Sequence, residues 1–179
     1  MTADPSGLYA QRLGVPLTMD LKLVDVNNGC APLVGYDVYV WHCDADGYYS
    51  YYSNQPGYLG SKSYANGYFL RAAQTTDACG EVTFNSIFPG WYPGRYPHLH
   101  IVVALGSTQE AVTQMTWPAT VITDVYTNAT SYGSYTVHGT PDTTFAGDNV
   151  FGGNGGQIAT TSGGVAAGYR SQWVLGIAL

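Results

Sequence analysis

The strongest constraint in this sequence is the absence of any sustained helical periodicity. Apolar residues nowhere recur at positions i, i+3, i+4 and i+7 over the length of a long helix, so no long helix is predicted. Short β-rich segments recur instead, separated by turns to which 23 glycines and 9 prolines contribute. The pattern predicts an all-β fold, an immunoglobulin- or prealbumin-like β-sandwich with long irregular loops.

Seven segments are predicted as strands because they alternate at period two or are rich in β-branched and aromatic residues. They cover 17–26, 36–42, 69–75, 81–87, 97–105, 111–116 and 169–179. Segment 149–168 is glycine-rich and is predicted to be an irregular meander. Segment 48–67 is almost entirely Tyr, Ser, Asn, Gly and Pro, and a long loop so rich in aromatics usually has a function. We predict one sandwich domain over 16–179, preceded by an N-terminal arm over 1–15.

The charge balance excludes two classes of partner. Only 10% of the residues are charged, against roughly 25% in an average domain, and the net charge is −6 with no basic run. Nucleic acid binding depends on clustered cations, so it is not expected. Apolar stretches such as Ile101–Leu105 fall far short of the roughly 20 residues of a membrane helix, so membrane insertion is not expected either.

Composition also suggests a compartment. The few basic residues, the abundance of Tyr, Thr, Ser and Gly, and the possible glycosylation sequon at Asn128 favour a secreted or extracytoplasmic protein. Three cysteines, Cys30, Cys43 and Cys79, allow at most one disulfide. Cys43 could pair with either of the others, or it could remain a packed free thiol.

The clearest chemical signal is a pair of histidines two residues apart. His98 and His100 lie in a predicted strand, where residues i and i+2 point to the same face, so their imidazoles can chelate one metal ion. A cupin-type site would need a glutamate soon after this pair, but Glu110 lies across a turn, which disfavours a cupin. Tyrosines surround the histidines instead, and a phenolate is a hard anionic donor suited to Fe(III).

At this point the sequence resembles the intradiol ring-cleavage dioxygenases. The segments that carry the resemblance are Trp41-His42-Cys43-Asp44-Ala45-Asp46-Gly47-Tyr48-Tyr49-Ser50, Phe69-Leu70-Arg71, Thr76-Asp77 and Phe88-Pro89-Gly90-Trp91-Tyr92-Pro93-Gly94-Arg95-Tyr96-Pro97-His98-Leu99-His100. The likeness extends from about Pro16 through Asp148-Asn149-Val150-Phe151 to the last strand. It implies that a non-haem Fe(III) is held by Tyr49, Tyr92, His98 and His100. Tyr92 would be the ligand that leaves when substrate binds.

The resemblance also implies a reaction. Catechol-type rings would be cleaved by O2 between the two hydroxyl-bearing carbons, giving cis,cis-muconate-type diacids. Arg95 and Gln114 match the family's arginine and glutamine, which would stabilise charge on the reacting ring and fix its pose. No unmatched Lys or Arg is evident for a substrate carboxylate, which favours catechol and alkyl- or hydroxy-catechols over protocatechuate.

Other residues of the same types are interpreted as structural. Tyr48, Tyr51, Tyr52 and Tyr58 are expected to pack, to lie at the surface or to line the approach to the site. His42 follows a core tryptophan and is expected to be structural, and His138 is expected to lie in a loop.

Two other functions fit parts of the pattern. One is a secreted carbohydrate- or polyphenol-binding sandwich that uses the aromatic loop without catalysis. The other is a zinc hydrolase built on the histidine pair, although it lacks an obvious carboxylate base. About sixteen residues precede Leu17, which leaves no room for the helical dimerisation domain of some family members. A monomer or small homo-oligomer is expected.

Overall fold

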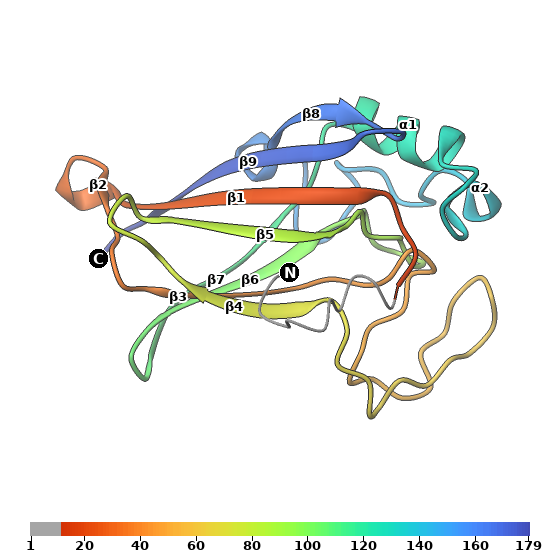
Figure 1. The fold of residues 1–179 in the computed structure, drawn as a ribbon, viewed down its shortest axis with the longest axis horizontal. Coiled ribbons are helices and arrows are strands. Elements are labelled where there is room, and N and C mark those ends of the chain that lie inside the picture. The colour runs from red at the N-terminus through yellow and green to blue at the C-terminus, as the bar shows by residue number, and fades with distance from the viewer. Residues whose placement is uncertain (1–11) are drawn as a thin grey trace.

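A computed structural model describes residues 12–179 and contains two β-sheets with few helices (Figure 1). The strands are β1 (Pro16–Asp25), β2 (Ala31–Pro32), β3 (Asp37–Trp41), β4 (Arg71–Thr75), β5 (Glu81–Ile87), β6 (Leu99–Leu105), β7 (Thr108–Met115), β8 (Thr160–Gly164) and β9 (Gly168–Ile177). The helices are α1 (Ala119–Asn128) and α2 (Tyr135–His138), with 3₁₀ turns η2 (Val26–Asn28) and η3 (Gly155–Gln157). The predicted all-β sandwich is confirmed.

The two sheets differ in topology. The first has β1 at its centre, parallel to β9 on one side and antiparallel to β5 and β2 on the other, with β8 beyond β9. The second has the order β4-β3-β6-β7 and is antiparallel throughout. In β6 the buried residues Leu99, Ile101 and Val103 alternate with partly exposed ones, so one face of this sheet packs into the core between the sheets.

Two strands, β2 and β8, and two helices, α1 and α2, were not predicted from the sequence. Helix α1 buries Ile122, Val125 and Tyr126 and is only ten residues long. Its β-branched residues favour extended structure when they are read locally. Strand β8 lies in the segment that was predicted to be an irregular meander. Its glycines give it a low intrinsic strand propensity, and it forms by pairing with β9.

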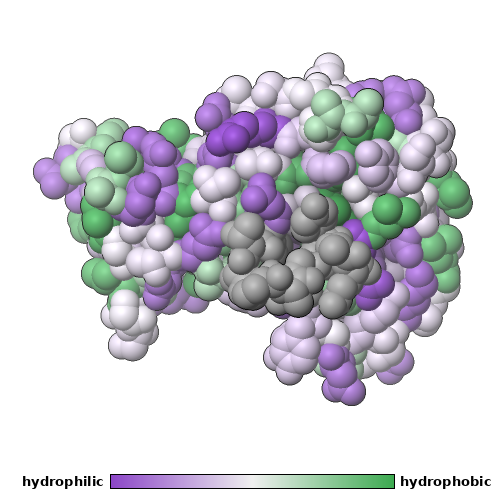
Figure 2. Space-filling model, viewed as in Figure 1, coloured by the Kyte–Doolittle hydropathy of each residue, from purple (hydrophilic) through white to green (hydrophobic). Residues whose placement is uncertain are grey.

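The irregular parts of the chain gather at one end of the sandwich. Figure 1 shows the loop between β3 and β4 projecting there, close to the end at which α1 and α2 lie, while the C-terminus lies at the opposite end. Hydrophobic and hydrophilic residues are interspersed over the face shown in Figure 2. None of the described helices is long and apolar enough to cross a membrane. The predicted N-terminal arm lies outside the described residues as far as residue 11, and the domain bounds stay a prediction.

Candidate metal centre

His98 and His100 are placed by strand β6. His98 directly precedes the strand and His100 is its second residue. Their Nε2 atoms lie 3.1 Å apart. The Nδ1 of His98 lies 2.6 Å from the carbonyl oxygen of Tyr96, which fixes the proton on Nδ1 and leaves the Nε2 lone pair facing the other histidine. Trp41, opposite His100 on β3, stacks on its ring at 4.5 Å with an interplanar angle of 3°.

Tyr49 approaches the same point from the loop between β3 and β4. Its hydroxyl lies 3.0 Å from the Nε2 of His98 and 3.2 Å from the Nε2 of His100. The side chain of Gln55 holds the Tyr49 peptide from both sides: the Tyr49 N–H donates to Oε1 at 2.6 Å, and Nε2 donates to the Tyr49 carbonyl at 2.7 Å. Sequence reasoning missed this role of Gln55, because an amide in a polar loop carries no local signal.

Tyr92 comes from the segment between β5 and β6, and its hydroxyl lies 3.2 Å from the Nε2 of His98. Two glycines let this segment interlock with the loop that carries Tyr49. A Cβ on Gly47 would lie 2.3 Å from the Trp91 carbonyl oxygen, and a Cβ on Gly90 would lie 2.6 Å from the Ala45 carbonyl oxygen. Side chains at these positions would push the two segments apart.

Burial keeps all four groups neutral in the protein alone. It lowers the pKa of His98 to about 3 and that of His100 to about 4. It raises the pKa of Tyr49 well above its ordinary value, and it also raises the pKa of Tyr92, where the Arg95 cation opposes part of the rise. A cation bound between these groups would favour the phenolate forms.

The donor atoms fit a single metal ion. Donors about 2.1 Å from one ion in tetrahedral or octahedral geometry lie about 3.0–3.4 Å from each other. Three distances from a tyrosine hydroxyl to a histidine Nε2 atom, and the distance between the two Nε2 atoms, span 3.0–3.2 Å. In the part of the chain that the structure describes, no three His, Cys, Asp or Glu side chains gather, so a metal here would need the tyrosines.

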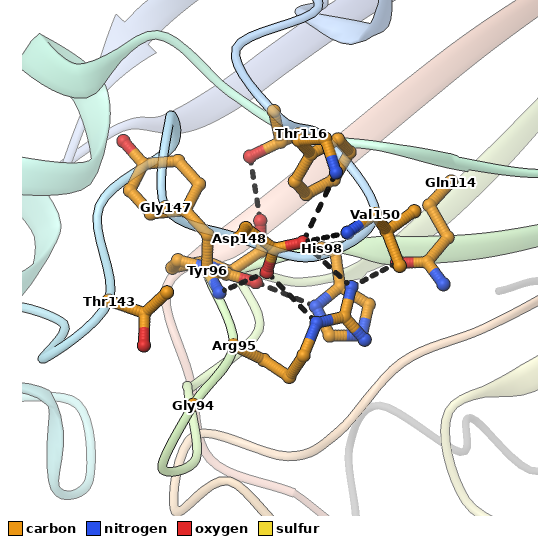
Figure 3. A network of polar contacts seen from close by, with 12 residues as sticks. Gly94, Arg95, Tyr96, His98, Gln114, Thr116, Thr143, Gly147, Asp148 and Val150 are labelled. Carbon is orange, nitrogen blue, oxygen red and sulfur yellow. Dashed lines mark hydrogen bonds and ion pairs between the residues drawn. The ribbon is translucent and has the colours of Figure 1, made fainter.

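Arg95 and Gln114 lie next to each other near His98, as Figure 3 shows. Arg95 Nη2 donates to Gln114 Oε1 at 2.5 Å, and Arg95 Nε donates to Asp148 Oδ2 at 2.9 Å. Gln114 is the residue of β7 directly opposite His100. The structure thus brings together all six residues that the sequence singled out, and it adds Asp148, to which the sequence analysis gave no role.

A cavity of about 360 Å³ opens next to the cluster and is lined by three of its four donor residues, Tyr49, Tyr92 and His100. Its lining is uncharged and largely aromatic; it consists of Trp41, Gly47, Tyr49, Tyr52, Gln55, Pro56, Tyr92 and His100. Arg95 and Gln114 do not belong to this lining, so they flank the histidines outside the cavity as it stands.

The residues interpreted as structural lie outside the cluster. His42 is buried, with Nδ1 2.7 Å from the Cys43 carbonyl and Nε2 2.7 Å from Ser86 Oγ, as a structural histidine should be. His138 ends helix α2 instead of lying in a loop, and it lies near the rings of Tyr58 and Trp91.

The four aromatic-loop tyrosines that were expected to pack, to lie at the surface or to line the site divide among these places. Tyr48 is buried, while Tyr51, Tyr52 and Tyr58 are about half exposed, and Tyr52 also lines the cavity. The three cysteines, all within the described residues, are free; Cys43 is the buried thiol and lies 3.3 Å from the Gly90 carbonyl oxygen.

Comparisons with known proteins identify the family of this chain. A family model described as Dioxygenase matches residues 5–132. An intradiol ring-cleavage dioxygenase from Tetranychus urticae is 28% identical with a TM-score of 0.81, over 96% of this chain and 84% of that chain. The dioxygenase domain of a dioxygenase carbohydrate-binding protein fusion from Streptomyces sp. SirexAA-E is 25% identical with a TM-score of 0.59, over 92% and 82%.

A more distant structure shares the fold. The 3-chlorocatechol 1,2-dioxygenase from Rhodococcus opacus 1CP is 17% identical with a TM-score of 0.60, over 94% of this chain and 62% of that chain. No match was found among curated proteins. Sheet architecture and family match together define a dioxygenase built on a β-sandwich. The chain belongs to the intradiol ring-cleavage dioxygenase family.

Proposed function

We propose that this protein is a non-haem Fe(III) intradiol dioxygenase that uses O2 to cleave catechol-type rings between their two hydroxyl-bearing carbons, giving cis,cis-muconate-type diacids. The observation that carries the proposal is the meeting of two tyrosine hydroxyls and two imidazole Nε2 atoms within 3.0–3.2 Å. Fe(III) bound there would supply Lewis acidity that lowers the pKa of both catechol hydroxyls, and the deprotonated ring would be electron-rich enough to react with O2.

The two tyrosines differ in a way that supports separate roles. The Tyr49 hydroxyl contacts both histidine Nε2 atoms, whereas the Tyr92 hydroxyl contacts only that of His98. Because Tyr92 meets only one of the two histidine nitrogens, we take it as the donor that yields its place to a substrate oxygen. Its phenolate oxygen could then accept one of the two protons that a catechol loses on binding, and the second would pass to solvent.

Arg95 and Gln114 are suited to act on the substrate ring. Arg95 supplies a fixed cation beside the histidines, which would stabilise negative charge that develops on the ring. Its hydrogen bond to Gln114 leaves the amide nitrogen of Gln114 free to donate toward the ring edge. Both side chains would orient the ring before it reacts.

The cavity favours uncharged catechols. No Lys or Arg is among its lining residues, whereas Trp41, Tyr52 and Tyr92 offer aromatic surface. A substrate carboxylate against this lining would lose its hydration without a cation to pair with, because Arg95 lies outside the lining and is already paired with Asp148. We therefore expect catechol and alkyl- or hydroxy-catechols to be preferred over protocatechuate.

The experiment is an oxygen-electrode panel on the iron-loaded protein with catechol, hydroxyquinol, caffeate and protocatechuate. We expect a reddish protein with one iron per chain, rapid oxygen uptake with catechol, and a muconate-type ultraviolet product. A protein that stays colourless and takes up no oxygen with any of the four after iron loading would contradict the proposal. Binding of these ligands without oxygen uptake would instead support the non-catalytic binding sandwich.

Secretion is part of the same proposal. Its support is compositional, since Lys and Arg together number only 6 and the sequon residue Asn128 lies exposed at the end of α1. Fractionation of the source cells tests it: the protein should be found in the medium or an extracytoplasmic fraction, and a purely cytoplasmic pool would contradict it.

A further inference from the structure

Asp148 is a buried carboxylate that binds an unusual number of donors. Its side chain is fully shielded from solvent, and it lies in the long connection between α2 and β8. Oδ1 accepts from the N–H groups of Val150 at 2.8 Å and Phe151 at 3.2 Å, which closes its own turn. Oδ2 accepts from the Tyr96 N–H at 2.8 Å and from Arg95 Nε at 2.9 Å. Figure 3 shows Asp148 at the centre of this network.

Asp148 restricts the orientation of the Arg95 guanidinium. Arg95 Nη2 also lies 3.4 Å from Asp148 Oδ1, while the same nitrogen donates to Gln114 Oε1. Because Nε and Nη2, the two nitrogens on one edge of the guanidinium, are both hydrogen-bonded, the orientation of the guanidinium plane is fixed before any substrate binds. The pKa of Asp148 lies below its ordinary value because hydrogen bonds from Arg95 and from backbone N–H groups outweigh the opposing effect of burial. The pair is therefore charged on both sides at neutral pH.

Asp148 also reaches His98 through the backbone of one residue, Tyr96. Its Oδ2 binds the N–H of Tyr96, and the carbonyl of the same residue accepts the Nδ1–H of His98 at 2.6 Å. Outer groups of this kind set the orientation of a ligating histidine. The carboxylate thus braces both the cation and one histidine of the candidate centre from a segment about fifty residues further along the chain.

We propose that Asp148 is the positioning residue for Arg95 and, through the backbone N–H and carbonyl of Tyr96, for His98. The inference rests on the proposed function, in which Arg95 acts on the substrate ring. Asp148 itself touches neither the four donors nor the cavity. Its contribution is to hold Arg95 in the one orientation that is useful for the reaction.

A double-mutant cycle tests this role. The variants are Asp148→Asn, Arg95→Ala and the double variant, and Asp20→Asn is the matched control, because Asp20 binds Arg170 Nε and Nη2 in the same way on the exposed side of the other sheet. Asn at position 148 keeps an acceptor for the Val150 and Phe151 N–H groups. We expect Asp148→Asn to lower kcat about 10–100-fold with a smaller change in KM, and Asp20→Asn to leave both unchanged.

The cycle separates positioning from general damage. Because Asp148 acts in part through Arg95, the factor that Asp148→Asn costs in the Arg95→Ala background should be clearly smaller than the factor that it costs in the wild type. Losses that multiply, or an Asp148→Asn enzyme with the wild-type kcat, would overturn the proposal.

A second readout needs neither iron nor activity. The chain has only four arginines, so their Nε–H signals can be assigned by NMR in the metal-free protein. We expect the Arg95 Nε–H to exchange slowly with water in the wild type and in Asp20→Asn, and rapidly in Asp148→Asn. Persistent protection in Asp148→Asn would overturn the positioning role. Protection that depends on Asp148 in a protein that consumes no oxygen would instead overturn the proposed function alone.

Discussion

The two histidines and the two tyrosines of the candidate centre reach the same point by different means. His100 belongs to a regular strand, and its place follows from pairing with Trp41 on one side and Gln114 on the other. Tyr49 and Tyr92 stand in irregular segments, where no ladder of backbone hydrogen bonds sets their position. The sheet thus holds His100 directly and places His98 at the start of the same strand, whereas individual contacts hold the oxygen donors.

The loop donors consequently need more supporting residues. Gln55 holds the Tyr49 peptide, and Arg71 holds the next residue, donating from Nη2 to the Ser50 carbonyl and from Nε to Ser50 Oγ, both at 2.9 Å. Gly47 allows the loop to pack against the segment that carries Tyr92. In this molecule the regular sheet needs few specific residues to place a donor, and the loops need several. The comparison can be tested with four kinds of substitution. They remove the Tyr49 hydroxyl, separate the two tyrosine-bearing segments, remove the hydrogen bonds of Arg71, and remove the Asp44 carboxylate.

The largest effect is expected from removing the loop donor itself. Tyr49→Phe deletes the hydroxyl that lies within 3.2 Å of both histidine Nε2 atoms and leaves the ring in place. We expect iron content to fall, the visible band to bleach or shift, and kcat to drop more than the roughly 100-fold typical of outer-shell changes. Metal analysis, absorbance and oxygen uptake measure this. Tyr51→Phe, on the exposed side of the same loop, is the control, and equal behaviour of the two variants would contradict the assignment of Tyr49.

A smaller loss is expected from separating the two tyrosine-bearing segments. Gly47→Ala places a Cβ 2.3 Å from the Trp91 carbonyl at a φ of +88°. Gly60→Ala is a matched control, since Gly60 has a φ of +83° and open space around its Cβ position. The control should lose only the backbone strain, about 1–2 kcal/mol of unfolding free energy. Gly47→Ala should lose clearly more and should also lower kcat; equal losses in denaturant titrations would show that the close approach is unimportant.

The sequence predicted the sheet side of this comparison better than the loop side. Every predicted strand forms, with ends shifted by three residues at most, because period-two burial is a local property. The convergence of His98 and His100 follows from the same periodicity. Strand β8 and helix α1 were missed because glycine content and β-branched residues masked them.

On the loop side, a local pattern alone does not distinguish Tyr49 and Tyr92 from the other tyrosines. The two were identified only through the family resemblance. The supporting residues Gln55, Arg71 and Asp148 were not identified at all. Asp148 illustrates the reason: its partners Arg95 and Tyr96 lie more than fifty positions earlier, so the contact exists only after the chain has folded.

A moderate effect is expected from removing the brace of the loop. Arg71→Ala deletes the donors to Ser50 and to the Tyr39 hydroxyl, the latter at 3.2 Å. Hydrogen bonds from a charged donor contribute about 1.5–3 kcal/mol, so we expect a stability loss of about that size and a fall in kcat/KM of about tenfold as Tyr49 loses its fixed position. Arg170→Ala, which removes an exposed ion pair, should change neither; an Arg71→Ala enzyme with wild-type kcat/KM would show that the loop holds Tyr49 without the brace.

The smallest effect on activity is expected from substituting Asp44. Its substitution should instead change how the stability of the protein depends on pH. Burial raises the pKa of Asp44 from 3.8 to about 6. Between about pH 4 and pH 6 the folded protein therefore holds this proton more tightly than the unfolded chain, so the contribution of Asp44 to stability falls as pH rises through that window. Asp44→Asn keeps an acceptor for the Tyr48 N–H, bound at 2.9 Å, and should leave turnover at pH 7 unchanged.

The stability of Asp44→Asn relative to the wild type should therefore increase from pH 4 to pH 6 and level off above it, as measured by denaturant unfolding at each pH. Asp77→Asn gives a control of opposite sign. Hydrogen bonds from the Glu81 and Cys79 N–H groups lower the pKa of Asp77, so its contribution is present above the ordinary pKa and is lost as pH falls. The stability difference between Asp44→Asn and the wild type could instead stay constant or decrease from pH 4 to pH 6. That result would mean that the loop carries no buried charge near Tyr49. The contrast between sheet and loop would then rest on hydrogen bonds and packing alone.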